Sequence, residues 1–272
     1  MKILLTNDDG ILSPGIRILG QLLTERGLLS GTMAPDRERS GVGHAMTMNH
    51  PVRAWLLEQD AFPAKSPAYA CDGNTTDCVT LALEAFFHDI DFVVSGINQG
   101  PNLGDDLTYS GTVCAALEGL MFDKSAMAIS LCCSSADWVR HNNTASAVAV
   151  ILLDWIEANP LPPGVMLNVN VPNVALGDLK GIRFTHKGIR RYRNKLTRMK
   201  NPHGQDCFWI GGTIDDHLVP GSDVLAVAEG YVSVTPIHMD MTHYETLDGH
   251  ITADTSAHLN EKLLSSFNTV QE

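Results

Sequence analysis

The sequence lacks the patterns that assign a chain directly to several well-known classes. Its 272 residues contain no apolar run of about 18 residues, the length that a membrane-spanning helix requires. Its 11 histidines include no HExxH pattern, and neither a P-loop nor a complete GxGxxG fingerprint occurs. These absences argue against a membrane-spanning protein, a zinc protease of the HExxH type, and an ATPase or kinase of the P-loop class.

The cysteines lack the spacing of a metal or redox site. None of the six occurs in a CxxC pair, and most lie in apolar stretches, so we expect reduced core residues rather than zinc ligands or disulfides. The apolar start Met1–Leu5 is interrupted at Asn7–Gly10, well before it reaches the length of a signal peptide. We therefore expect a cytoplasmic protein.

Positive charge is also scarce. The chain has 19 lysines and arginines against 31 acidic residues, a formal net charge of −12. A protein that binds a nucleic-acid polymer or an anionic membrane usually presents a basic face, so we expect neither as a partner. Hydrophobic residues make up 44% of the chain and charged residues 18%, which is typical of a folded protein with a sizeable core.

Short apolar runs alternate with stretches of helical spacing through the first two thirds of the chain. Strands are expected at 2–6, in an apolar run that ends at Ala34, near 52–57 and 67–71, and at 91–94, 126–131 and 166–171. Helices are expected from Pro14 to about Gly27, after a cap at Thr75 or Thr76, after Ser110, and over 145–156. This alternation predicts an α/β fold with a mostly parallel sheet that helices cover on both faces.

The pattern changes near residue 180. Short strand-like pieces follow near 181–185, 206–210, 223–227 and 231–235, with a basic patch at 187–193 and a final helix near 256–267. We therefore predict a catalytic core over residues 1–180. Residues 181–272 are predicted to form an extension with β-hairpins and a terminal helix, which packs on the core and on another subunit.

Four polar loops follow strand-like runs, and these loops hold the candidate site residues. They are the loop Asn7–Gly10, the loop around Ser40 and Gly41, the segment 95–98, and the approach to Ser110. In an open parallel sheet, ligands bind beyond the carboxyl ends of the strands. The four loops are therefore predicted to meet at one edge of the sheet.

Asp8 and Asp9 are adjacent carboxylates directly after a buried strand. Two such charges repel each other unless a cation or a proton lies between them. A hard divalent ion such as Mg²⁺ or Mn²⁺ binds carboxylate, hydroxyl and amide oxygens, which Asp8, Asp9, Ser40 and Asn98 supply together. An ordinary solvated turn before the next helix explains Asp-Asp-Gly equally well.

The segment Ser110-Gly111-Thr112 stands at the start of an expected helix. Free backbone N–H groups and the positive helix end suit a phosphate there, while a simple N-cap is the alternative. The backbone around Gly41 offers similar donors, and Asn7 is added as a phosphate contact from the first loop. The basic patch at 187–193 is either a solvated face, a mouth that attracts anions, or a subunit interface.

Several segments together resemble one known family. The segments Ile3–Ile11, Ala34–His44, Val94–Asp106, Tyr109–Val113 and Glu229–Pro236 are similar to those of the SurE (survival protein E) family. They occur in the same order and cover most of the chain. The resemblance implies a Rossmann-like three-layer sandwich whose C-terminal extension makes the contacts of a homodimer or homotetramer.

The same resemblance implies an activity and a ligand set. It implies a divalent-metal-dependent phosphatase, a 5′-nucleotidase that also accepts nucleoside 3′-monophosphates and in some members short polyphosphate. One Mg²⁺ or Mn²⁺ per subunit would be held by the positions that match the family's ligands, Asp8, Asp9, Ser40 and Asn98. The family's phosphate-binding turn carries over onto Ser110, Gly111 and Thr112.

Two segments depart from the family pattern. The family commonly has Gly-Thr-Pro-Thr-Asp where this chain has Gly73-Asn74-Thr75-Thr76-Asp77, and the lost proline is expected to loosen a turn near the nucleoside. His243 is out of register with a histidine that some members carry after the aspartate matching Asp240.

The residues are compatible with three functions. In the first, Asp8 and Asp9 are the catalytic residues of a metal-assisted hydrolysis, with Asp8 positioning or deprotonating the water. In the second, Asp8 is the covalent nucleophile of an aspartyl-phosphate phosphatase, although such enzymes usually carry a DxD arrangement. In the third, the chain is a non-catalytic regulator that binds nucleotides in the same pocket.

Overall fold

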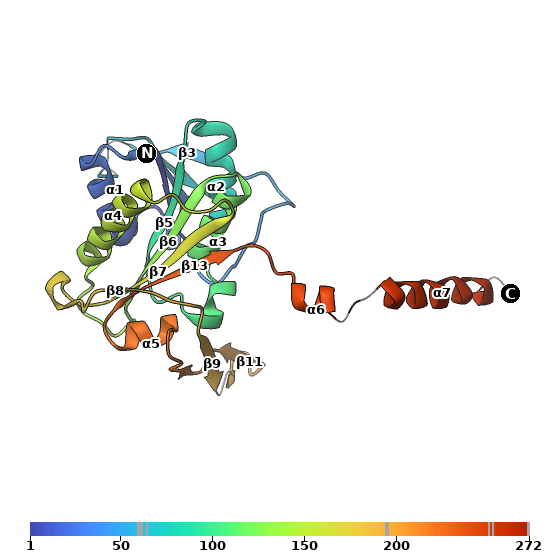
Figure 1. Ribbon diagram of the computed structural model, residues 1–272. Coiled ribbons are helices and arrows are strands. Elements are labelled where there is room, and N and C mark those ends of the chain that lie inside the picture. The colour runs from blue at the N-terminus through green and yellow to red at the C-terminus, as the bar shows by residue number, and fades with distance from the viewer. Residues whose placement is uncertain (59–61, 64, 194–195, 250, 252, 271–272) are drawn as a thin grey trace. The chain divides into compact units, whose positions relative to one another are not determined.

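The centre of the unit Met1–His238 is a nine-stranded sheet (Figure 1). The computed structural model describes residues 1–58, 62–63, 65–193, 196–249, 251 and 253–270. The strands lie in the order β3-β4-β2-β1-β5-β6-β7-β13-β8. Their bounds are β1 Ile3–Thr6, β2 Leu29–Pro35, β3 Ala54–Leu56, β4 Ala68–Cys71, β5 Phe92–Gln99, β6 Ser125–Cys132, β7 Val165–Pro172, β8 Ile182–Phe184 and β13 Val232–His238.

Most neighbouring strands of this sheet run parallel. β1 pairs in parallel with β2 and β5, and β5, β6 and β7 continue the same direction. The antiparallel pairs are β3 with β4 and β13 with β7. The predicted mostly parallel sheet is confirmed, and its carboxyl ends lie together at one edge.

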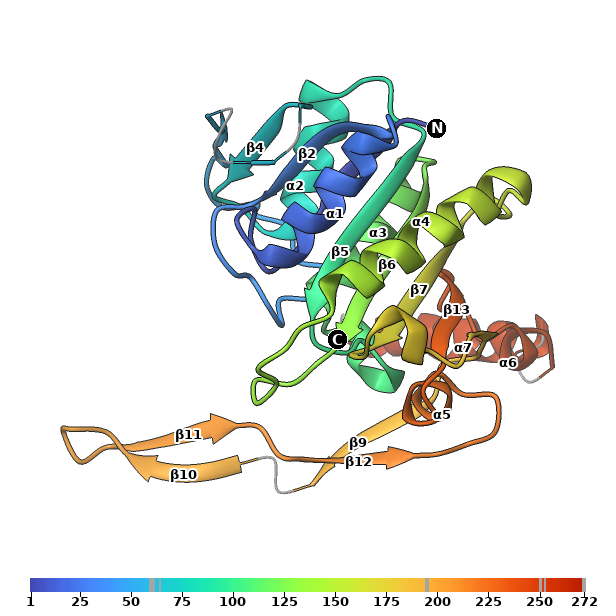
Figure 2. The ribbon, with the colours of Figure 1, turned by 90° about the vertical axis from the view of Figure 1, so that its left-hand side faces the viewer.

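Helices cover both faces of the sheet. α1 (Pro14–Glu25) and α4 (Asn142–Ala158) lie side by side on one face, in front of the sheet in Figure 2. α2 (Thr75–Leu81), its continuation η1 (Ala82–Phe86) and α3 (Gly111–Met121) lie on the other face. This arrangement confirms the predicted Rossmann-like three-layer sandwich.

The strand sequence explains how one sheet supports two cores. Successive side chains of a strand point to opposite faces. Ile3 and Leu5 of β1 pack in the core beneath α1 and α4, whereas Leu4 between them packs in the core beneath α2 and α3. A strand that is buried on both faces is apolar at every position, and this explains the continuous apolar run in the sequence.

Two predicted boundaries were wrong. β5 does not stop at Ser95 but continues to Gln99, and Ser95 and Ile97 are fully buried within it. The cap of α2 is Asn74 rather than Thr75 or Thr76. The Asp77 carboxylate accepts from the Asn74 backbone N–H at 2.7 Å, which completes a capping box.

The expected strand near 223–227 is instead the helix α5 (Asp223–Ala228). The periodicity of a short apolar run does not show whether the run forms a strand or a helix. Here the residue that caps the run determines that it forms a helix. The Ser222 hydroxyl accepts a hydrogen bond from the backbone N–H of Leu225 at 3.2 Å and so begins a helix. The short helices η2 (Gly104–Thr108) and η3 (Leu176–Asp178) also belong to this unit.

Residues 189–193 and 196–217 form a hairpin arm (Figure 2). β9 (Ile189–Arg193) pairs antiparallel with β12 (Thr213–His217), and further along the arm β10 (Leu196–Lys200) pairs with β11 (Asp206–Ile210). The predicted strand at 206–210 is confirmed. β9 contains the arginines of the basic patch, and two of them, Arg190 and Arg193, form ion pairs with aspartates of β12.

A second unit spans Met239–Glu272 and contains α6 (Tyr244–Gly249) and α7 (Ala253–Val270). The predicted terminal helix near 256–267 is thereby confirmed. β8 and β13, which follow residue 180, belong to the central sheet. The predicted division into a core over 1–180 and an extension over 181–272 stays a prediction. Among the described residues, no helix has both the length and the apolar character needed to cross a bilayer.

The capping box of α2 predicts a measurable loss of stability. Asp77 also accepts hydrogen bonds from Thr47, so Asp77→Ala removes the cap and leaves partly buried donors without a partner. We expect the free energy of unfolding to fall by about 2 kcal/mol. Urea denaturation measures this, with the exposed Glu84→Ala as the control, which should stay within about 0.5 kcal/mol of the parent. Equal midpoints for the two variants would contradict the role of Asp77.

Candidate active site

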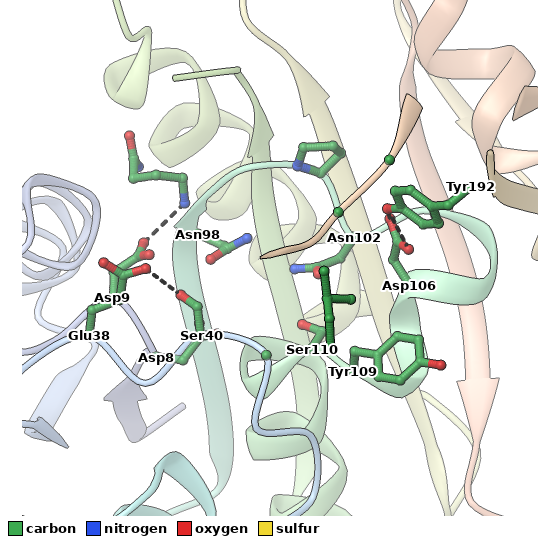
Figure 3. Close-up of a pocket in the computed structure, with 16 residues that line it drawn as sticks. Asp8, Asp9, Glu38, Ser40, Asn98, Asn102, Asp106, Tyr109, Ser110 and Tyr192 are labelled. Atoms are coloured by element: carbon green, nitrogen blue, oxygen red, sulfur yellow. Dashed lines mark hydrogen bonds between the residues drawn. The ribbon is translucent and has the colours of Figure 1, made fainter. Parts of the chain in front are cut away.

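The loops predicted to converge do meet at the carboxyl edge of the sheet. A pocket of about 560 Å³ opens there, and Asp8, Asp9, Ser40 and Asn98 all line it (Figure 3). Asp8 and Asp9 follow β1, Ser40 lies in the loop after β2, and Asn98 lies near the end of β5. The structure thus brings together four residues that are far apart in the sequence, as the predicted metal site requires.

Asp8 is held at the start of α3. Its side chain is almost fully buried, and the Thr112 hydroxyl donates a hydrogen bond to Oδ1. Gly111 makes the close approach possible, because a Cβ at that position would lie 2.8 Å from the Asp8 Cβ and 2.9 Å from Oδ2. The glycine in Ser110-Gly111-Thr112 therefore lets the positive end of the helix pack directly against the carboxylate.

Asp9 lies beside Asp8 in the pocket. Its Oδ2 accepts a hydrogen bond from the backbone N–H of Gln99 at 3.0 Å. Burial and the neighbouring Asp8 carboxylate raise the pKa of Asp9 to about 7, and burial also raises the pKa of Asp8. Two carboxylates that resist ionising together favour a bound cation, which would offset their repulsion.

Ser40 and Asn98 add two neutral oxygens to the carboxylate pair. Ser40 is exposed to the pocket, and its hydroxyl donates to Oε1 of Glu38 at 2.8 Å. The amide nitrogen of Asn98 donates to the carbonyl of Gly100 at 2.9 Å, so Oδ1 is the amide atom that a metal ion would bind. Carboxylate, hydroxyl and amide oxygens together fit a hard ion such as Mg²⁺ or Mn²⁺.

This donor set differs from a cluster of ionisable ligands. Within the described ranges, three or more His, Cys, Asp or Glu side chains nowhere gather closely enough to hold a metal ion. The predicted set contains two carboxylates, and its other members are a hydroxyl and an amide. Such a set holds an ion through oxygen atoms of mixed charge and leaves room for water or substrate oxygens.

The predicted phosphate contacts fall into two groups. Ser110 and Gly41 line the pocket, and the Ser110 oxygen also caps α3 by accepting from the Val113 N–H at 3.0 Å. Asn7 and Thr112 are fully buried behind the pocket. Asn7 donates to the carbonyl of Gly10 and to the Ser13 hydroxyl, so the structure assigns it to holding the loop rather than to lining the pocket.

The sequence analysis missed several residues that line the pocket. These are Glu38, Gln99, Pro101, Asn102, Asp106, Tyr109, Tyr192, Ile210, Gly211 and Gly212. Asn102 and Asp106 lie in a segment that resembles the SurE family, so the resemblance was the signal that pointed to their neighbourhood. The sequence predicted β-hairpins in the region of the arm, but nothing in its pattern indicated that Tyr192, Ile210, Gly211 and Gly212 line this pocket.

Asn102 is fixed by a buried network of amides. Its backbone N–H donates to Oδ1 of Asn170 at 2.8 Å, and its Nδ2 donates to the Ser130 hydroxyl at 2.8 Å. Its carbonyl accepts from the side-chain amides of Asn168 and Asn170. The loop after β5 is therefore anchored to β6 and β7, which holds this wall of the pocket in place.

The charged side chains that line the pocket, as far as the structure describes the chain, are all acidic. They are Asp8, Asp9, Glu38 and Asp106. An anionic substrate would be repelled by such a lining unless a bound cation reversed the local field. The electrostatics of the pocket therefore point to a metal ion in the same way as the donor set does.

Comparison with known proteins identifies similar chains. The family model described as Survival protein SurE matches residues 3–194. The 5′-nucleotidase SurE of Legionella pneumophila subsp. pneumophila is 42% identical over 249 residues, which cover 91% of this chain and 95% of the relative. The 5′-nucleotidase SurE of Geobacter metallireducens is 44% identical over 251 residues, with coverages of 91% and 95%.

A solved structure is similar as well. The crystal structure of the SurE protein from Aquifex aeolicus superposes with a TM-score of 0.78 at 36% sequence identity. The match covers 91% of this chain and 97% of that protein. The similarity therefore extends well beyond the segments around the pocket.

The repulsion between the two carboxylates predicts a test of metal binding. In EDTA, Asp9→Asn removes one of two mutually repelling buried groups, so we expect its melting temperature to equal or exceed that of the parent. Millimolar Mn²⁺ should stabilise the parent and leave the variant almost unchanged, because binding to the folded state alone raises stability. Differential scanning calorimetry measures both effects. A Mn²⁺ response of full size in Asp9→Asn would contradict the assignment of this ligand.

Proposed function

The chain belongs to the SurE family of survival proteins, and on that basis we propose that it hydrolyses nucleoside 5′-monophosphates to nucleoside and inorganic phosphate. The observation that supports this most directly is the juxtaposition of Asp8, Asp9, Ser40 and Asn98 in one pocket at the start of α3. The cofactor in this proposal is one Mg²⁺ or Mn²⁺ per subunit. The pocket volume of about 560 Å³ lies in the range usual for sites that bind small molecules.

The metal ion, when bound, would polarise a phosphoryl oxygen and lower the pKa of a coordinated water. The chain's own residues would hold the rest of the phosphate. The Ser110 oxygen already accepts from the Val113 N–H, so its hydroxyl hydrogen is left to donate to a phosphate oxygen. The first N–H groups of α3 and the backbone near Gly41 would donate to the other oxygens as negative charge shifts between them.

Asp8 is the residue that we propose orients the attacking water. Its Oδ1 is engaged by the Thr112 hydroxyl, so Oδ2 remains to help hold the metal ion and to accept a hydrogen bond from a water beside it. The close packing of Gly111 on this carboxylate fixes its position relative to the start of α3, where the phosphate would lie. Such fixed positioning lowers the entropic cost of bringing water and phosphate together.

Nucleoside 3′-monophosphates and short polyphosphates are further candidate substrates. Monoesters should be preferred over polyphosphates, because the described pocket lining offers acidic side chains and no lysine or arginine that would neutralise added phosphate groups. We further propose that the protein acts in the cytoplasm as a homodimer or homotetramer. Exposed apolar side chains on the arm, among them Phe208, Trp209 and Ile210, support an assembly through that region.

The proposed activity predicts metal-dependent release of phosphate from AMP and GMP. Asp8→Asn and Asp9→Asn should each lower kcat/KM by at least about 1,000-fold, because each removes a charged group from the reacting centre while the fold is kept. Malachite-green detection of phosphate with Mn²⁺, compared with EDTA, measures this, and circular dichroism checks folding. Parent-like rates in either variant with saturating metal would sink the assignment.

The rival functions predict different results in the same experiment. An aspartyl-phosphate phosphatase would leave a phosphoryl group on Asp8 that is detectable by mass spectrometry after an acid quench. A non-catalytic regulator would bind AMP and release no phosphate under any metal condition. Our proposal expects turnover without a trapped phosphoenzyme.

A further inference from the structure

The pocket has a second end, which the hydrolysis of a phosphate monoester does not require. Asp8, Asp9 and Ser40 lie at one end, whereas Asp106, Tyr109 and Tyr192 lie at the other (Figure 3). Ile210, Gly211 and Gly212 of the hairpin arm also line the pocket. Residues from the core and from the arm therefore meet where the part of a substrate remote from the phosphate would lie.

Tyr192 is held rigidly at this second end. Its hydroxyl lies 2.8 and 2.7 Å from the two carboxylate oxygens of Asp106. Burial and the hydrogen bond to Asp106 raise the pKa of Tyr192 to about 12, so the phenol stays neutral and keeps donating. Because the hydroxyl is already engaged, the part of Tyr192 that is left to contact a ligand is the aromatic ring.

Asp106 is itself fixed by a buried ion-pair network. Arg190 lies 3.2 Å from Asp106 and forms two hydrogen bonds, of 2.6 and 2.7 Å, with the carboxylate of Asp216. The Arg190 side chain is only 5% exposed. A buried guanidinium is costly unless it is fully paired, and this one joins both strands at the base of the arm to the helix η2. The network thus sets the position of Tyr192 against the core.

A second aromatic side chain lies at the same end of the pocket. Tyr109 follows η2, and its side chain is 66% exposed although it lines the pocket. Its backbone carbonyl accepts from the Gly43 N–H at 3.0 Å, which ties it to the loop that carries Ser40. An exposed tyrosine on an anchored backbone offers a flat apolar surface at little conformational cost.

We propose that this second end is a nucleobase subsite, in which Tyr192 and Tyr109 supply the aromatic contact surface and Asp106 is a positioning residue. This inference rests on the proposed function, and it names the part of the substrate that the phosphate end leaves unrecognised. Stacking tolerates any base, because every base has an aromatic face. The subsite therefore selects nucleotides over phosphate esters that lack a base, and it discriminates weakly between purines and pyrimidines.

Gly211 and Gly212 line the same pocket as these tyrosines and carry no side chains, which leaves room for a planar ring there. A Cβ built on Gly211 would meet Trp209 Cδ1 at 3.7 Å as its nearest neighbour, so a larger residue is tolerated by the free protein. Gly211→Leu should then fill part of the space that a base occupies. This variant tests the subsite without disturbing the Asp106 network.

The test compares AMP with ribose 5-phosphate, which has the same phosphate and sugar but no base. We expect the parent to prefer AMP. In Tyr192→Ala, Tyr109→Ala and Gly211→Leu, the ratio of kcat/KM for AMP to that for ribose 5-phosphate should fall by about 5- to 100-fold. Trp138→Ala is the control, since Trp138 is a fully exposed aromatic residue that does not line the pocket. Its ratio should equal that of the parent.

Two conservative variants separate positioning from mere folding. Tyr192→Phe keeps the ring and loses the hydrogen bonds to Asp106, and Asp106→Asn weakens the same link from the other side. Both should raise KM for AMP more than they change kcat, because the ring remains but is held less firmly. A fall in kcat at unchanged KM would show instead that these residues act on the chemical step.

Binding of adenosine distinguishes failure of this subsite from failure of the proposed function. Calorimetric titration of adenosine in EDTA needs neither metal nor turnover. We expect Tyr192→Ala to weaken the binding of adenosine by about 5- to 100-fold, the range expected for the kcat/KM ratio. If no phosphate ester is hydrolysed yet adenosine binds in this tyrosine-dependent way, the subsite stands and the proposed function fails. The subsite is overturned if the parent shows no preference for AMP, or if the tyrosine variants change neither the ratio nor adenosine binding.

Discussion

Two carboxylates that cannot both be charged without help are the constraint on which the rest of the site depends. Asp8 and Asp9 follow a strand that is buried on both faces, and the Asp8 side chain is itself almost fully buried. Burial raises the pKa of both groups, and the neighbouring Asp8 carboxylate raises the pKa of Asp9 further. Hydrogen bonds from the Thr112 hydroxyl and the Gln99 N–H stabilise the charged carboxylates in part, and a bound metal ion would offset the remaining repulsion between them.

The surrounding structure keeps this arrangement from relaxing. The sheet fixes the ends of β1 and β5, and α3 packs against Asp8 because position 111 carries no side chain. The amide network around Asn102 anchors the loop after β5 to two further strands. A cation bound here would meet oxygens that are already in place, which is the condition for electrostatic stabilisation of a transition state without reorganisation.

The sequence was informative where a residue's role depends on its near neighbours. The buried run before Asp8, the proline at the start of α1 and the serine that caps α3 are local signals, and each led to an element that the structure contains. The convergence of the loops followed from the general behaviour of parallel sheets, and the donor set itself followed from the resemblance to a family.

The far end of the pocket was not predictable in this way. Tyr192 reaches Asp106 across 86 positions of the chain, and the strand that carries it showed only a cluster of basic residues. The short run at 223–227 failed for a related reason, because its apolar residues suit a strand or a helix and the Ser222 cap decides between them. Contacts that depend on where a hairpin folds back leave no periodic trace in the sequence.

The clamp of Arg190 between Asp106 and Asp216 gives the protein a modular character. The groups that we propose take part in hydrolysis all belong to the sheet and the loops and helix at its edge. Several of the groups that we propose select the substrate belong instead to the hairpin arm, which these ion pairs join to η2. Replacing the hairpin arm with that of a relative, while keeping an aspartate at position 106 to pair with the arginine of the new arm, is then a route by which evolution or an engineer can change the substrate preference of the enzyme. The residues proposed for hydrolysis would stay unchanged.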